Sequence, residues 1–232
     1  ESDYIIFAEN NFPYLINKHN LNNFITDDKK VIIGATTLND GNYYNSFFLL
    51  EKNKIHIFDK KILVPFGEFL PFRKYLSFME IISGGTDFQK GRIERIITTT
   101  DNLKILPIIC YEILFDKIFN NINKKEIDVL VNITNDSWFG TKFGPYQHFY
   151  ISRMKAIVAN KPLLRVSNNG ISAIIDNNGN IIRSSKLDKI TQLKYKLKID
   201  SKKSYFSAHK IFLGYLFSIF IFLIIYNKRK KI

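Results

Sequence analysis

Residues 103–112 read Leu-Lys-Ile-Leu-Pro-Ile-Ile-Cys-Tyr-Glu, and this stretch indicates the fold class of the 232-residue chain. Its first seven residues are mostly apolar and include three isoleucines, a pattern typical of a short strand that is buried on both faces. The residues that follow, 112–119, predict a short helix. A buried strand that leads into a helix is typical of α/β domains, in which functional side chains gather at the carboxyl ends of the strands.

Cys110, at the end of this strand, is the only cysteine in the chain. It can therefore form no intramolecular disulfide and no zinc site built from several thiolates. Free cysteines are most often small core residues, and that is one interpretation of Cys110. The other is a catalytic nucleophile, because a nearby helix amino terminus favours the thiolate and because sites in α/β sheets lie at strand ends.

The surrounding sequence, up to residue 200, predicts one domain with a sizeable core. Nine further strands are expected, at residues 4–8, 31–36, 44–50, 54–58, 129–133, 163–167, 171–176, 181–184 and 193–199. Residues 177–180, Asn-Asn-Gly-Asn, predict a hairpin turn. Residues 145–160 predict a helix with Pro145 in its first turn. Residues 63–92 are rich in aromatic residues, proline and glycine without a clear period, which predicts a long ordered loop.

The carboxyl terminus has the composition of a membrane segment. Residues 211–226 carry no charge and are followed by four basic residues before residue 232. Sixteen helical residues rise about 24 Å, somewhat less than a hydrocarbon core of roughly 30 Å, but flanking lysines can reach the headgroups. We expect a linker at 201–209, a transmembrane helix at 210–227 and a basic cytoplasmic tail at 228–232; a buried core helix is the alternative. The positive-inside rule then places the large domain on the other side, in a bacterium the periplasm.

The charge balance restricts the partners. The chain carries a net charge of +13, from 34 basic and 21 acidic residues. The lysines are scattered and no helix concentrates arginine and lysine, so no nucleic-acid partner is expected, and attraction to anionic lipid headgroups is the better interpretation. No metal or cofactor is expected either, because the aspartates and histidines lack ligand spacing and the glycines lack a phosphate-binding pattern.

A thiol nucleophile requires a base and a donor for the oxyanion. Of the four histidines only His148 is a plausible partner for Cys110, although a histidine on a helix is more often structural. Glu9, at the end of the first predicted strand, and Lys60, just after the strand at 54–58, form a better set with the thiol: a carboxylate base and an ammonium. Taken singly, each charge is more often a solvated surface residue.

Several longer motifs carry a resemblance to a known family. Phe7-Ala-Glu-Asn10, Lys60-Lys-Ile-Leu-Val-Pro-Phe-Gly-Glu68, Ile109-Cys-Tyr-Glu112 and Asn135-Asp-Ser-Trp-Phe-Gly140 occur in the order found in the nitrilase, or carbon-nitrogen hydrolase, superfamily. More narrowly, the chain resembles the carboxyl-terminal portion of the apolipoprotein N-acyltransferase family, through Leu63-Val-Pro-Phe-Gly-Glu-Phe-Leu-Pro71, Asn132-Ile-Thr-Asn-Asp-Ser-Trp-Phe-Gly140 with Gly144-Pro-Tyr-Gln-His148, and Arg165-Val-Ser-Asn-Asn-Gly170. Several long motifs in the correct order make the resemblance specific.

The resemblance implies a nitrilase-like α-β-β-α sandwich over residues 1–200, followed by one carboxyl-terminal transmembrane helix. It also implies a catalytic triad in which Glu9 is the base, Lys60 the oxyanion donor and Cys110 the nucleophile. Lys60 is preferred to Lys61 because it precedes Glu68 by the family's spacing of eight residues. Supporting or substrate-binding roles fall to Glu68, Tyr111, Glu112 and Trp138, with the backbone N–H of Tyr111 as the second oxyanion donor.

The activity implied by the resemblance is transfer of a fatty acyl group from phospholipid, through a thioester on Cys110, to the amino-terminal diacylglyceryl-cysteine of lipoproteins at the bacterial inner membrane. Residues 66–78 are expected either to admit acyl chains or to pack in the core. Family members carry several membrane helices upstream of the nitrilase domain, and we expect such helices as partners missing from this chain. The alternatives are a membrane-anchored amidase and an inactive fragment of a split acyltransferase.

Overall fold

The structure is a computed structural model that describes residues 3–12, 15–16, 25, 28–76, 78, 80, 86–92, 95–120, 122–198 and 215–222. The chain divides into two compact units, Glu1–Ile199 and Asp200–Ile232. In the second unit, residues 215–222 are helical and their side chains are exposed. The expected linker at 201–209, the tail at 228–232 and the ends of the expected span at 210–227 lie outside the described residues. Within the described ranges, no helix has the length and apolar character needed to cross a bilayer.

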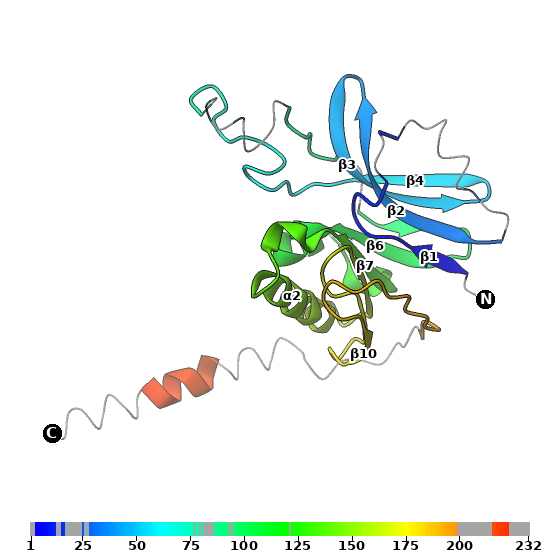
Figure 1. Cartoon of the computed structure of the whole chain (residues 1–232). Helices are drawn as coiled ribbons and strands as arrows, with labels where there is room; N and C mark the ends of the chain where they lie inside the picture. Colours follow the sequence, from blue (N-terminus) through cyan, green and yellow to red (C-terminus); the bar gives the residue numbers. More distant parts are fainter. Residues whose placement is uncertain are drawn as a thin grey trace. The chain divides into compact units, whose positions relative to one another are not determined.

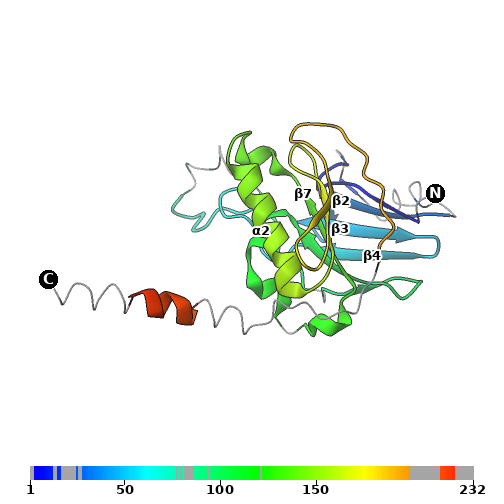
Figure 2. The same ribbon diagram turned by 90° about the horizontal axis from the view of Figure 1, so that it is seen from below.

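Two sheets stack face to face in the first unit, and a helix covers one of them (Figures 1 and 2). The four-stranded sheet has the order β1 (Tyr4–Ile6), β2 (Lys30–Asn39), β3 (Asn42–Glu51), β4 (Lys54–Asp59). The six-stranded sheet has the order β10 (Ile181–Ser184), β9 (Ala173–Ile175), β8 (Leu163–Ser167), β7 (Val129–Thr134), β6 (Lys104–Ile109), β5 (Ile97–Thr98). Strands β6, β7 and β8 run parallel, so their carboxyl ends lie at one edge.

Apolar side chains from both sheets form the interior of the sandwich. Phe47 and Phe58 of the four-stranded sheet share one buried cluster with Ile109 and Val131 of the six-stranded sheet. The other face of the six-stranded sheet packs against helix α2 (Gly144–Ala159), which contributes Phe149 and two alanines to a second cluster. This layering confirms the predicted nitrilase-like α/β architecture for the two stacked sheets and the helix on the six-stranded sheet; the second helical side of the predicted α-β-β-α sandwich is not seen among the described residues. No helix among the described residues covers the outer face of the four-stranded sheet, where a third cluster of apolar side chains packs.

Most predicted elements are present, with three differences. Residues 193–198 form no strand, although apolar residues and lysines alternate in their sequence. Alternation alone does not make a strand, because a strand also requires a hydrogen-bonded neighbour. The helix expected at 112–119 is instead two short 3₁₀ helices, Cys110–Leu114 and Asp116–Phe119, separated by the extended residue Phe115. Strand β5 was not predicted, since two residues are too few to show a period.

Two local predictions are confirmed. Helix α2 contains Pro145 in its first turn, where the missing N–H costs no helical hydrogen bond, and ends at Asn160 in a left-handed conformation. The turn between β9 and β10 is closed by the N–H of Asp176, which donates to the carbonyl of Asn180, and Gly179 adopts the positive φ of 82° that the turn requires.

The aromatic loop lies at the surface. Residues 61–76, cyan in Figure 1, leave the end of β4 and extend away from the two sheets without a regular strand or helix. Phe72, Tyr75 and Phe78 are 77%, 82% and 72% exposed. The core-packing interpretation of this segment is therefore wrong for these side chains.

Candidate active site

Three strand ends bring the three predicted catalytic residues into one buried cluster. Glu9 follows β1, Lys60 directly follows β4, and Cys110 directly follows β6. The Lys60 ammonium lies 3.5 Å from Oε1 of Glu9. The backbone of Asn135, just after β7, joins the other two: its N–H donates to Oε2 of Glu9 at 2.9 Å, and its carbonyl lies 3.9 Å from Sγ of Cys110.

Lys60 is 1% exposed, so its charge must be matched by buried anions. Its ammonium donates to Oε1 of Glu68 at 2.8 Å, in addition to its contact with Glu9. Burial alone lowers the pKa of Lys60, but the negative charges of Glu9 and Glu68, joined at high pH by that of the ionised Cys110, outweigh burial and raise the pKa above its usual value. Lys60 is therefore a fixed cation at neutral pH and does not act as a base.

Cys110 lies in a constrained position at the first residue of a 3₁₀ helix. Its φ of 48° is in the left-handed region, which is uncommon for a residue with a side chain. Burial, followed by the negative charge of Glu9, raises the pKa of the thiol to about 12, against the opposing effect of Lys60. A helix amino terminus was expected to favour the thiolate, but burial and the charge of Glu9 act in the opposite direction and the pKa is raised. At neutral pH the thiol keeps its proton, and attack on a substrate requires a base.

Glu68 and Glu112 connect the segments that carry the cluster. Glu68 bonds Lys60 through Oε1 and accepts the N–H of Val64 through Oε2, which folds the loop after β4 back toward the ammonium. Glu112 is fully buried and accepts the N–H groups of Lys61 and Ile109, the residues next to Lys60 and Cys110. Its charge is balanced by Arg95, whose two terminal nitrogens donate to Oε1 and Oε2 at 2.8 and 2.9 Å. Glu112 thus fixes the position of Lys60 relative to Cys110.

The two remaining predicted residues lie nearer the surface. Tyr111 is half-buried, and its ring packs edge-on against Phe115 with 4.9 Å between centroids. Trp138 lies on a 3₁₀ helix, Asp136–Phe139, that follows Asn135, and its ring is 77% exposed. Trp138 is therefore at the surface of the loop that borders the cluster rather than within the cluster.

The imidazole of His148 contacts Asp136 and the backbone of Cys110, and no contact with the thiol is among its interactions in the described residues. Its Nδ1 lies 2.8 Å from Oδ1 of Asp136, and burial lowers the pKa of the imidazole, with Arg165 acting in the same direction. Arg165 donates to Oδ2 of Asp136 at 2.7 Å and to Oδ1 of Asn132 at 2.6 Å. Although burial opposes ionisation, His148 and Arg165 lower the pKa of Asp136 to about 2. This buried group fixes the loop after β7. Its residues belong to the motifs that carry the family resemblance, and the sequence alone does not show that these residues have a structural role.

Two asparagines also contact Glu9, and the sequence analysis did not identify them. Asn168 donates through Nδ2 to the backbone carbonyl of Glu9 at 2.8 Å. Asn45 donates through Nδ2 to Oε1 of Glu9 at 2.7 Å. The sequence contained one signal for Asn45. It is a polar residue that shares the inward face of its strand with the buried residues Phe47 and Leu49, and a polar residue at such a position requires polar partners.

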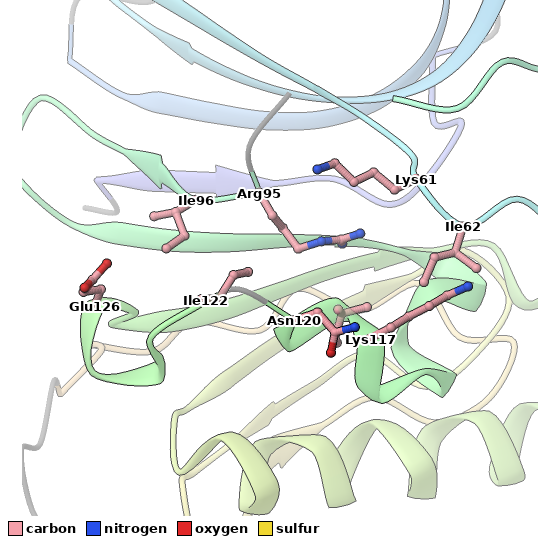
Figure 3. Close-up of a pocket in the computed structure, with 9 residues that line it drawn as sticks. Lys61, Ile62, Arg95, Ile96, Lys117, Asn120, Ile122 and Glu126 are labelled. Carbon is pink, nitrogen blue, oxygen red and sulfur yellow. The ribbon is translucent and has the colours of Figure 1, made fainter. Parts of the chain in front are cut away.

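A cavity of about 610 Å³ in the described part of the chain lies outside this cluster (Figure 3). Its lining includes Lys61, Arg95 and Lys117, but none of the three predicted catalytic residues. Its wall contains the Arg95 partner of Glu112, so it adjoins the buried ion pair. The buried charges around the thiol, rather than this cavity, mark the candidate reaction centre. No group of three histidine, cysteine or carboxylate side chains that could hold a metal occurs among the described residues.

Comparisons with known proteins match this chain to a family and to named relatives. The carbon-nitrogen hydrolase family matches residues 13–198. An apolipoprotein N-acyltransferase from Rickettsia typhi is 43% identical over 152 residues, 65% of this chain and 30% of that protein. Proteins of the same name from Rickettsia bellii and Rhizobium rhizogenes are 41% and 34% identical over 83% and 78% of this chain. The chain spans 30–39% of the length of these relatives.

Solved structures support the fold. A nitrilase superfamily member from Saccharomyces cerevisiae has a TM-score of 0.62 at 17% identity, covering 82% of this chain and 74% of that one. A carbon-nitrogen hydrolase from Helicobacter pylori has a TM-score of 0.57 at 16% identity, covering 81% and 74%. At this identity the likeness concerns the architecture alone.

Proposed function

This chain belongs to the carbon-nitrogen hydrolase family, and on that premise we propose that it is the catalytic part of an apolipoprotein N-acyltransferase. In this proposal it transfers a fatty acyl group from a phospholipid, through a thioester on Cys110, to the amino-terminal diacylglyceryl-cysteine of a lipoprotein. The observation that carries the proposal is the buried cluster itself: a protonated thiol next to a carboxylate and a permanently charged ammonium. The identity to three proteins of that name supports the choice of acyl acceptor.

The first half-reaction forms the thioester. Glu9 takes the proton of Cys110 as Sγ attacks the ester carbonyl of the phospholipid, and the carbonyl oxygen becomes an oxyanion. The Lys60 ammonium and the backbone N–H of Tyr111 stabilise that oxyanion. The C–O bond then breaks, Glu9 returns the proton to the departing oxygen, and a lysophospholipid leaves.

The second half-reaction transfers the acyl group to nitrogen. The α-amine of the diacylglyceryl-cysteine attacks the thioester carbonyl, and Glu9 accepts a proton from the amine. The C–S bond breaks as the amide forms, and the proton returns to Sγ, which regenerates the thiol. Because one product leaves before the second substrate reacts, the kinetics are ping-pong.

A membrane location fits both substrates, which are lipids. The exposed rings of Phe72, Tyr75 and Phe78 follow Glu68 in sequence, and exposed aromatic residues of this kind contact lipid or acyl chains in membrane-associated proteins. We propose that this loop admits the acyl chain, that Trp138 contributes to substrate binding, and that residues 210–227 anchor the protein in the bacterial inner membrane with the catalytic domain in the periplasm. Upstream membrane helices of the kind found in full-length family members complete the enzyme in this proposal.

Intact-mass spectrometry after incubation with phospholipid vesicles tests the proposal. The protein, co-expressed with the upstream membrane segment of a relative, is expected to gain one fatty acyl group, and Cys110→Ala is expected to gain none. The control Asn178→Ala, at an exposed position of the turn between β9 and β10, should be acylated like the wild type. An unmodified thiol together with ammonia release from small amides would instead assign the second candidate, a membrane-anchored amidase, which the same three residues can support.

A further inference from the structure

Asn45 lies opposite Lys60 in the sheet. Strands β3 and β4 pair with Ser46 opposite Asp59, and the N–H of Lys60 donates to the carbonyl of Asn45 at 2.8 Å, which extends the ladder by one residue. Side chains alternate along a strand, so Asn45 projects to the same face as Phe47, into the sandwich interior. The amide is 3% exposed. Its place next to the ammonium is therefore set by strand register.

The amide of Asn45 joins two carboxylates. Its Nδ2 donates both hydrogens, to Oε1 of Glu9 and to Oε1 of Glu68, each at 2.7 Å. Lys60 contacts the same two oxygens, at 3.5 and 2.8 Å. Two donors and two acceptors thus alternate in a closed ring. The opposite rotation of the amide is excluded, because it would place Oδ1 against two carboxylate oxygens.

Nothing else among the described residues explains this orientation. The Oδ1 of Asn45 is buried and has no hydrogen-bond partner among the described residues. Burying an unpaired oxygen costs free energy, so this atom does not hold the side chain in place. The side chain is therefore held by the two carboxylates, and it holds them in return. Without it, Oε1 of Glu9 keeps only the longer contact with Lys60, and the two anionic side chains lose the neutral donor that separates them.

We propose that Asn45 is a positioning residue for the thiol chemistry. It fixes the rotation of the Glu9 carboxylate so that the base faces the Cys110 proton, and it spaces Glu9 and Glu68 on either side of Lys60. This inference rests on the proposed function for the role of Glu9, but not on the identity of the lipid substrates. Asn45 acts only through Glu9, and its own atoms do not touch the reacting groups.

The test measures acylation of Cys110 by p-nitrophenyl butyrate, a small activated ester that requires no lipid recognition. The burst of p-nitrophenol reports formation of the acyl-enzyme. Asn45→Val is expected to slow the burst by about 10- to 100-fold, as expected for a misplaced catalytic group, with little change in ester affinity. Asn45→Thr has the same shape as valine but keeps one donor, so it should recover part of the rate. Asn42→Val, at an exposed position of the same strand, should match the wild type.

A double-mutant cycle separates positioning from a general structural role. In a Glu9→Gln background, Asn45→Val should cause little additional loss, because the base on which Asn45 acts has been removed. The same loss in both backgrounds, or a wild-type burst in Asn45→Val, overturns the proposal. If Asn45→Val does not fold, the comparison of Asn45→Thr in the two backgrounds decides it. Absence of any burst in the wild type counts instead against the proposed acyl-enzyme function.

Discussion

Glu9→Gln is predicted to make the Cys110 thiol more reactive toward an alkylating reagent while it sharply slows acyl transfer from an ester. The Glu9 carboxylate has two opposing effects on the thiol. Its negative charge disfavours a nearby thiolate at equilibrium and is, after burial, the second cause of the raised pKa of Cys110. As a base, however, it removes the thiol proton during attack on an ester. The substitution removes both effects, and two different reagents report them separately.

The magnitude follows from the pKa. The pKa of Cys110 rises from 9.0 to about 12, so at pH 8 its thiolate is about 1,000-fold scarcer than in an ordinary cysteine. Iodoacetamide, which reacts with pre-formed thiolate, should therefore modify the wild type about 1,000-fold more slowly than it modifies a model thiol. Because Glu9→Gln removes the opposing charge and leaves Lys60 in place, the pKa of Cys110 falls and alkylation accelerates.

Alkylation is followed by mass spectrometry and ester acylation by the p-nitrophenol burst, on the same protein preparations. Glu126→Gln, the same substitution at an exposed glutamate, serves as the control and should change neither rate. If Glu9→Gln slowed alkylation, the wild-type thiol would already exist as a thiolate paired with a cation, and the reasoning from burial and charge would be refuted.

Three other predictions concern charge and stability. Lys60→Met leaves Glu9 and Glu68 without their cation, so it should lower the free energy of unfolding by about 3–5 kcal/mol and the acylation rate by about 100- to 1,000-fold. Lys61→Met should change neither quantity. Urea unfolding measures the stability and burst kinetics measure the acylation rate. Equal stability of the two variants would contradict the buried ion pair. Because the pKa of Cys110 is raised, the unfolded chain releases the thiol proton from about pH 9, while the native protein holds it to about pH 12. The stability of the wild type should therefore fall across this window by up to about 1.4 kcal/mol per pH unit. Cys110→Ala should lack this component. Parallel pH profiles for the two proteins would show that the native thiol is not protonated there. Arg95→Met should destabilise the fold by about 3–5 kcal/mol, because it leaves the buried carboxylate of Glu112 without its cation. Arg92→Met, at an exposed position, serves as the control. A wild-type urea midpoint in Arg95→Met would count against the Arg95–Glu112 ion pair.

Much of the architecture was predictable because it depends on local patterns. Nine of the strands expected at residues 4–184 are present, with ends that differ by a few residues, and the hairpin and the helix with Pro145 lie where the sequence indicates. The predicted strand at 193–199 failed over its described residues for the opposite reason. Its alternation is local, but pairing with a neighbour is a tertiary event.

The candidate site was predictable in part. The strand-end rule and the motif order indicated Glu9, Lys60 and Cys110, and the structure brings all three into one cluster. The spacing to Glu68 selected Lys60 rather than Lys61, and in the structure the Lys60 ammonium donates to Glu68 at 2.8 Å. By contrast, His148 and Asp136 lie in the same motif region but form a separate buried group with Arg165. Residue type alone cannot distinguish a charge that positions a loop from one that meets a substrate.

The sequence by itself therefore determined most of the strands, the charged residues near their ends and the family that the motifs resemble, because each of these depends on the spacing of residues along the chain. Only the tertiary structure decided the protonation of the thiol, since the pKa of Cys110 depends on how completely two sheets bury it and on the distance to Glu9. The same is true of the ring formed by Asn45, Glu9, Glu68 and Lys60, whose members come from three separate segments. Burial and charge proximity are properties of packing, and packing brings together residues that no local pattern relates.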